Sequence, residues 1–158
     1  MRILGFDPGL ERLGYGIVDR EGSRIKCVTY GLISTPRIAL PDRLRLIQEE
    51  TRQIIKEFEP TAVSTERLLF AANKTTAMDV SKALGVVLCC VGEFGIPWTE
   101  FSPPEIKLSV VGNGAASKGQ VQFMVTKLLN LAETPKPDDI ADALAIALTY
   151  ALRTPPPK

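Results

Sequence analysis

Short apolar runs separated by turn residues occupy the first part of the chain. The runs cover residues 3–6, 14–19 and 24–33, and Glu21-Gly22-Ser23 joins the second run to the third. Apolar runs of this length, bounded by glycine-containing turns, are typical of β-strands. We therefore predict three consecutive strands, with a hairpin between the second and the third.

A helical period replaces the short runs after residue 40. Pro41 suits the first position of a helix, and Pro60 would stop one. Between these prolines, apolar residues recur at helical spacing at Leu44, Ile47, Ile54 and Phe58. The apolar run 62–65 then predicts a fourth strand, parallel to an earlier strand because a helix connects the two.

The second half of the chain is mainly helical by the same criteria. Ser117 and Gln120 form a capping-box pattern, which marks the start of one helix. The predicted elements are a helix over 75–94, a strand over 96–100, and helices over 105–110, 118–129 and 138–152. The order β-β-β-α-β-α-β-α, followed by further helices, predicts an α/β fold with a mixed five-stranded sheet and helices on both faces.

The overall composition indicates which class of protein the chain belongs to. The 158 residues have a formal net charge of +1, with 45% hydrophobic and 23% charged residues. These values are typical of a soluble globular protein, and the length predicts a single domain over residues 1–153. Residues 154–158 are rich in proline, so we expect a disordered tail. The longest apolar run, 84–91, is too short to span a membrane, and we expect no membrane association.

The cysteine and histidine content indicates the cellular setting and limits the groups available for catalysis. The chain has three cysteines and no histidine. Cys89 and Cys90 lie in an apolar stretch and are predicted to be buried thiols, which fits a reducing, cytoplasmic setting. Because there is no imidazole, any hydrolysis would depend on carboxylates, lysines or metal-bound water.

Four acidic residues stand where an apolar segment ends or begins. Asp7 follows the first strand, Glu66 follows the fourth, and Asp139 and Asp142 open the last helix. Open α/β sheets bind ligands outside the carboxyl ends of their strands, and helical residues three apart share one face. We therefore expect these acids to converge. The alternatives are an Asx turn at Asp7, a solvated Glu66, and capping of the helix N-terminus by Asp138 or Asp139.

A site with several carboxylates repels itself. Two charges about 4 Å apart cost roughly 1 kcal/mol in water and about 4 kcal/mol near a protein surface. Mg²⁺ or Mn²⁺ would relieve this repulsion, and two ions about 3.5–4 Å apart suit phosphodiester hydrolysis. The acids therefore predict a two-metal site, in which one ion activates the attacking water and the other neutralises the leaving oxygen.

Two lysines and one loop are candidate contacts for a phosphate backbone. Lys118 follows a glycine-rich stretch and starts a helix, where unbonded backbone amides favour an anion, and Lys107 is the second candidate. Each lysine could equally be solvated. The segment after Glu66 could stack on an unpaired base or simply cover the core, and its candidate residues are Arg67, Leu69, Phe70, Asn73 and Lys74.

Several motifs, in collinear order over nearly the whole chain, resemble those of one nuclease family. The motifs are Asp7-Pro8-Gly9 with Gly14-Tyr15-Gly16, Glu66, Lys107 with Val110-Val111-Gly112, Ser117-Lys118, and Asp142-Ala143-Leu144-Ala145-Ile146-Ala147 preceded by Asp139. Any one of them is weak, but the ordered set is specific. It resembles the RuvC family of Holliday junction resolvases, in the ribonuclease H-like superfamily.

The resemblance implies a structure-selective DNA endonuclease that resolves four-way junctions by paired symmetric nicks in homologous recombination and DNA repair. It implies that Asp7, Glu66, Asp139 and Asp142 hold two Mg²⁺ ions, with Mn²⁺ as a substitute. Lys107 and Lys118 would then act on the phosphate. The implied partners are four-way junction DNA, a second copy of the chain, and the RuvA and RuvB branch-migration proteins. A two-fold dimer would supply two acidic clusters for two cuts.

Two positions depart from the family pattern. Relatives have an acid or a histidine at the position of Asp139. Some relatives have an aromatic residue in place of Leu69, and Phe70 could take over its role of stacking on a base.

One rival hypothesis is a ribonuclease H-like nuclease with another substrate, such as the RNA strand of a hybrid. Another is a non-cleaving module that binds branched DNA. A third rival is an actin-like phosphotransferase, but we expect 158 residues to leave no room for its second domain.

Overall fold

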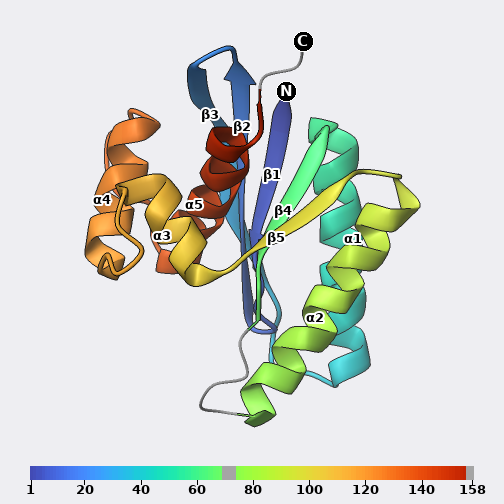
Figure 1. The fold of residues 1–158 in the computed structure, drawn as a ribbon. Helices are drawn as coiled ribbons and strands as arrows, with labels where there is room; N and C mark the ends of the chain where they lie inside the picture. The colour runs from blue at the N-terminus through green and yellow to red at the C-terminus, as the bar shows by residue number, and fades with distance from the viewer. Residues whose placement is uncertain (69–73, 156–158) are drawn as a thin grey trace.

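A five-stranded mixed sheet forms the centre of the computed structural model, which describes residues 1–68 and 74–155, without the side chains of 74–76 (Figure 1). The strand order is β3-β2-β1-β4-β5, in which β1 pairs antiparallel with β2 and parallel with β4. The strands are β1 (Arg2–Asp7), β2 (Arg12–Glu21), β3 (Arg24–Ser34), β4 (Ala62–Glu66) and β5 (Trp98–Phe101). The predicted α/β class, with a mixed five-stranded sheet, is confirmed.

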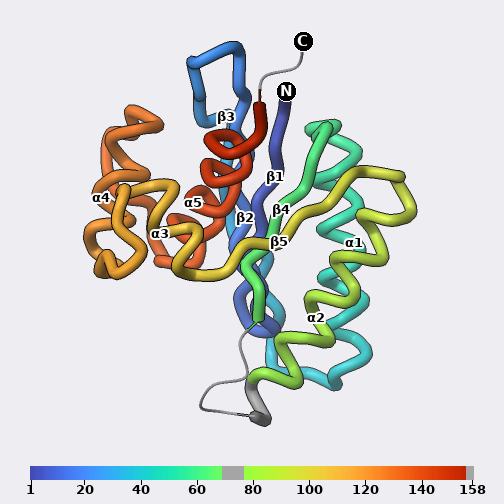
Figure 2. The backbone as a smooth tube through the Cα atoms, in the orientation of Figure 1, coloured from blue at the N-terminus to red at the C-terminus, as the bar shows by residue number. Residues whose placement is uncertain are grey.

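Helices cover both faces of this sheet, as predicted (Figure 1). They are α1 (Leu40–Phe58), α2 (Lys74–Glu93), α3 (Pro103–Val111), α4 (Lys118–Leu128) and α5 (Asp138–Arg153). Helices α1 and α2 cover one face, and α5 lies across the other with α3 and α4 beside it, as the tube trace also shows (Figure 2). Each face therefore has its own apolar layer.

Side chains along β1 alternate between the two faces of the sheet. Leu4 and Phe6 pack in the layer under α1 and α2, whereas Ile3 packs in the layer under α5. Because successive strand residues point to opposite faces, Gly5 and Asp7 lie on the α5 side with Ile3. The last residue of the central strand therefore presents its carboxylate to α5.

Helix α5 lies unusually close to the sheet, and glycines make the approach possible. A Cβ atom added at Gly5 would stand 2.3 Å from the carbonyl oxygen of Ala143, and one at Gly14 would stand 2.1 Å from that of Asp139. No side chain other than hydrogen fits at these two positions. The first turns of α5 are thus held directly over β1 and β2, which explains the Gly14-Tyr15-Gly16 pattern in physical terms.

Strand β5 begins at Trp98, two positions later than predicted. The preceding Ile96 N–H donates to the Val91 carbonyl at the end of α2, and Pro97 has no N–H to pair with a neighbouring strand. The Trp98 indole donates to Thr65 Oγ1 at 3.1 Å. Proline chemistry, rather than hydrophobicity, therefore sets this boundary.

The prediction that both adjacent cysteines are buried is wrong for one of them. Cys90 is buried, but Cys89 is exposed. Neighbours on a helix point about 100° apart, and α2 is covered on only one side, so a continuous apolar run does not bury every residue. Among the helices in the described part of the chain, none is both long enough and apolar enough to cross a bilayer.

The start of the predicted tail is held against the fold. Arg20 in β2 donates to the carbonyl oxygens of Ala151 and Thr154 at the end of α5. Residues 156–158 lie outside the described residues, so the disorder expected for 154–158 stays a prediction.

Candidate active site

Two of the four predicted acids end neighbouring parallel strands. In the β1–β4 register Phe6 stands opposite Thr65, so Asp7 and Glu66 are each one residue further along adjacent strands. Ser64, two residues before Glu66, donates its hydroxyl to the Ile146 carbonyl of α5 at 3.3 Å. Glu66 therefore lies on the same face as Asp7.

The other two acids lie in the first turns of α5, above the same strand ends. The backbone of Asp139 lies against Gly14, which pairs with Asp7 in the β1–β2 register. Asp142 is one turn further on and lines a cavity together with Glu66. Chain segments far apart in the sequence thus place all four acids at one end of the sheet.

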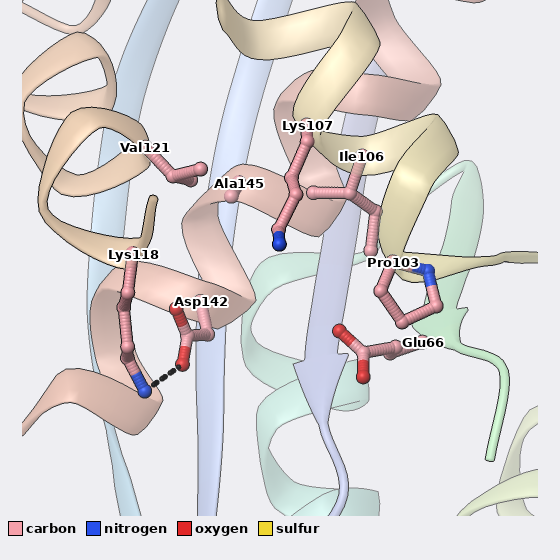
Figure 3. Close-up of a pocket in the computed structure, with 8 residues that line it drawn as sticks. All are labelled: Glu66, Pro103, Ile106, Lys107, Lys118, Val121, Asp142 and Ala145. Atoms are coloured by element: carbon pink, nitrogen blue, oxygen red, sulfur yellow. Dashed lines mark ion pairs between the residues drawn. The ribbon is translucent and has the colours of Figure 1, made fainter. Parts of the chain in front are cut away.

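The cavity has a volume of about 280 Å³ and is open to solvent. Its lining residues are Glu66, Pro103, Ile106, Lys107, Lys118, Val121, Asp142 and Ala145. Figure 3 shows the Lys107 side chain directed into the space between Glu66 and Asp142. Both predicted lysines therefore lie at the cavity, Lys107 from α3 and Lys118 from the start of α4.

Lys118 is bound to carboxylates in this structure. Its Nζ atom lies 2.5 Å from Asp138 Oδ2 and 2.9 Å from Asp142 Oδ2. Burial acts to lower the pKa of Lys118, but the hydrogen bonds to Asp138 and Asp142 outweigh it and raise the pKa. The side chain therefore remains an ammonium ion. Lys118 is 55% exposed, but it is paired with two carboxylates as well as solvated. N-capping of α5 by Asp138 is not correct, since the N-cap residue is Pro137.

The charges on the acids act on one another. Burial raises the pKa of Asp7 to about 8, helped by the negative charges of Asp142, Glu66 and Asp139 and opposed by Lys118. Burial and Asp142 also raise the pKa of Glu66, and burial raises that of Asp142. Burial and mutual repulsion therefore make the charged forms of these acids unfavourable.

Asp139 has a different environment from the other acids. Its Oδ2 atom is buried and accepts no hydrogen bond from any described residue. The Arg12 Nε atom lies 3.2 Å away from it as an ion pair. A second cavity, of about 350 Å³, lies beside Asp139 and Arg12. It is lined by Gly9, Leu10, Glu11, Arg12, Val80 and Asp139. Arg12 was not among the predicted site residues.

Comparison with known proteins decides the family. The profile of the family described as crossover junction endodeoxyribonuclease RuvC matches residues 3–150. A RuvC of Alkaliphilus oremlandii is 47% identical over 152 residues, covering 96% of this chain and 93% of the relative. This chain belongs to the RuvC family. It is therefore a crossover junction endodeoxyribonuclease.

Solved structures agree with this membership. Thermus thermophilus RuvC in complex with a Holliday junction substrate has 35% sequence identity and a TM-score of 0.92, covering 96% of this chain and 93% of that chain. The yeast mitochondrial Holliday junction resolvase has 16% identity, covers 94% of this chain and 78% of that chain, and has a TM-score of 0.67, which shows a shared fold.

The donor chemistry of this RuvC family site suits divalent cations. Within residues 1–68 and 74–155, no three acidic or cysteine side chains are already arranged as a metal-binding group. The four acids nevertheless offer oxygen ligands only, which Mg²⁺ and Mn²⁺ prefer. Burial, together with the neighbouring acids, raises the pKa of Asp7, and a cation bound beside it would favour its charged form. The residues present therefore fit a metal that would draw the carboxylates together.

The predicted DNA-contact loop is only partly described. Arg67 lies outside the cavity lining, and its Nε atom is 3.0 Å from Glu100 Oε1 on β5. Leu69, Phe70, Asn73 and the side chain of Lys74 lie outside the described residues, so their contact with DNA stays a prediction.

Proposed function

We propose that this RuvC family endonuclease resolves four-way DNA junctions by two-metal-ion hydrolysis at Asp7, Glu66, Asp139 and Asp142. The observation that supports this proposal best is the convergence of the four acids where β1, β4 and α5 meet, beside the cavity that Glu66 and Asp142 line. Two ions bound there, Mg²⁺ with Mn²⁺ as a substitute, would supply an activated water and positive charge for the leaving oxygen.

The residues around the acids have separate tasks in this proposal. Asp7 and Glu66 are fixed by the sheet, so they provide the rigid part of the site. A cation held by Asp142 would compete with Lys118 for that carboxylate, and the Lys118 ammonium group would then be available to a phosphate oxygen. Lys107 already points into the cavity and holds the substrate phosphate from the other side.

The symmetry of the reaction supports a dimer. One chain has one acidic cluster, and resolving a junction requires two cuts, so a two-fold homodimer would present two equivalent clusters. We also propose that the enzyme works in the cytoplasm with the RuvA and RuvB branch-migration proteins.

A cleavage assay tests the proposed substrate. With Mg²⁺ present, the full chain is expected to nick a four-way junction at symmetric positions, and to leave linear duplex DNA and an RNA–DNA hybrid largely intact. Preferential cutting of the hybrid would favour the rival nuclease. Tight junction binding without nicking at millimolar Mg²⁺ would favour the binding module.

Magnesium is expected to stabilise the folded protein, and more so at higher pH. The folded-state pKa of Asp7, about 8, lies above the ordinary value of 3.8, so the folded state retains a proton between these values. Without metal, stability linked to Asp7 is therefore present below about pH 4 and is lost as the pH rises through about 8. Mg²⁺ takes the place of that proton, so the rise in Tm should be larger near pH 8 than near pH 5.

Melting curves with and without millimolar Mg²⁺ at both pH values provide the measurement. Asp7→Asn is the control, because it removes the titrating group. This variant should show a shallower fall of Tm with pH and little response to Mg²⁺. A wild-type Tm that does not change on addition of Mg²⁺ at either pH would contradict the metal assignment.

Lys118→Ala is expected to slow cutting by about 10²-fold while leaving junction binding within a few-fold, because one charged contact to the reacting phosphate is removed. The measurement is the single-turnover cleavage rate at saturating enzyme. Lys127→Ala is the matched control, since Lys127 lies on the same helix and packs over Phe123, 5.5 Å from its ring centre. Equal rates for the two variants would remove Lys118 from the reaction.

A further inference from the structure

Arg12 stands beside the active site without a role in the reaction proposed above. Its Nε atom lies 3.2 Å from Asp139 Oδ2, and the two side chains are 52% and 20% exposed. The oxygen that it approaches is buried and accepts no hydrogen bond from the part of the chain that the structure describes. Arg12 is thus the cation in contact with the enclosed side of this carboxylate.

The backbone that presents Arg12 is firmly held. Thr35 N–H donates to the Glu11 carbonyl at 3.0 Å, and the Thr35 hydroxyl donates to the Leu10 carbonyl at 2.6 Å. A Cβ atom at Gly9 would stand 1.9 Å from the Arg12 carbonyl oxygen, so the turn closes tightly on this residue. The position of Arg12 relative to α5 is therefore fixed by the sheet and by the turn before β2.

We propose that Arg12 is a positioning residue that fixes the orientation of Asp139 for metal binding. The proposal rests on the two-metal function given above and deepens it. Arg12 holds the carboxylate from the side of the second cavity, lined by the turn between β1 and β2. The Asp139 side chain is thereby kept next to the acids on the strand ends. In metal sites, groups that orient a ligand in this way typically change metal affinity by about 10–100-fold when removed.

Removing Arg12 has two opposing effects, and their sizes decide the expected result. Loss of a positive charge strengthens the attraction for a cation, but the guanidinium is half exposed, so solvent screens this contribution. Loss of the ion pair removes the cation next to the buried oxygen of Asp139, while the negative charge of Asp142 repels the side chain from the cluster. The carboxylate then turns away, and metal binding weakens.

The test is the Mg²⁺ concentration that gives half of the maximal rise in Tm, measured on the full chain. Arg12→Gln should raise this concentration by about tenfold, and Arg12→Lys should raise it less. Arg37→Gln is the matched control, because it removes the same charge from a side chain that is 88% exposed and lies 3.9 Å from Glu11. This control should behave as the wild type.

An Asp139→Asn background shows whether Arg12 acts through Asp139. There, Arg12→Gln should add no further change in the Mg²⁺ midpoint. An unchanged or lower midpoint for Arg12→Gln in the wild-type background would overturn the proposal. Weaker metal-free junction binding with an unchanged Mg²⁺ midpoint would also overturn the proposal, because Arg12 would then be a DNA contact. A wild type that neither responds to Mg²⁺ nor cuts junctions would instead overturn the proposed function itself.

Discussion

Asp7→Asn is expected to reduce junction cleavage by at least about 10²–10³-fold, while junction binding stays close to that of the wild type. The loss follows because Asp7 ends the central strand and is coupled to all three other acids. Binding survives because phosphate contacts and DNA shape provide most of the affinity. The measurements are the single-turnover cleavage rate and the junction Kd at a stated salt concentration.

Glu21→Gln is the control for this variant. It also removes one negative charge, but Glu21 is exposed and ends β2 at the opposite end of the sheet from Asp7. Its cleavage rate should match that of the wild type. If Asp7→Asn turned over junctions at the wild-type rate, the cluster would not be the catalytic centre.

Gly5→Ala is expected to destabilise the protein by about 1–3 kcal/mol, which corresponds to a fall in Tm of roughly 2–12 °C for a chain of this size. The added Cβ atom would stand 2.3 Å from the Ala143 carbonyl oxygen and 2.7 Å from the Ala147 backbone nitrogen. Both atoms are backbone of α5, so the whole helix has to move. Because α5 bears Asp139 and Asp142, cleavage should fall together with stability.

Thermal melts of Gly5→Ala and Gly119→Ala provide the comparison. An added Cβ atom at Gly119 meets nothing within 4 Å, and alanine is the better helix former. Gly119→Ala should therefore keep or raise Tm. A Gly5→Ala variant as stable as the wild type would show that α5 does not depend on this close contact.

Much of the fold follows from local patterns in the sequence. Apolar runs bounded by glycine and proline located the strands, and the Ser117–Gln120 pair located the start of α4, where both capping-box hydrogen bonds are present. These signals are local, because each depends on residues that are close together in the chain. Where a local signal competes with tertiary context, as at Cys89 and at the start of β5, the sequence prediction was wrong or shifted.

The candidate site was predictable to the extent that its residues end secondary-structure elements. Asp7 and Glu66 could be placed because parallel neighbouring strands end at one edge of a sheet. The ion pairs of Lys118 with Asp138 and of Arg12 with Asp139 were not predicted, because they join segments far apart in the sequence. For Arg12 a usable signal existed: the tight turn after Asp7 returns the chain beside β1, so the first residue of β2 has to lie near the strand end.

A structure determined from crystals grown with Mn²⁺ tests the convergence of the four acids most directly. Anomalous scattering should give two manganese peaks about 3.5–4 Å apart, bound by carboxylate oxygens of Asp7, Glu66, Asp139 and Asp142. Manganese bound only elsewhere on the protein, with these four side chains remaining apart, would contradict a two-metal catalytic centre at the ends of β1 and β4.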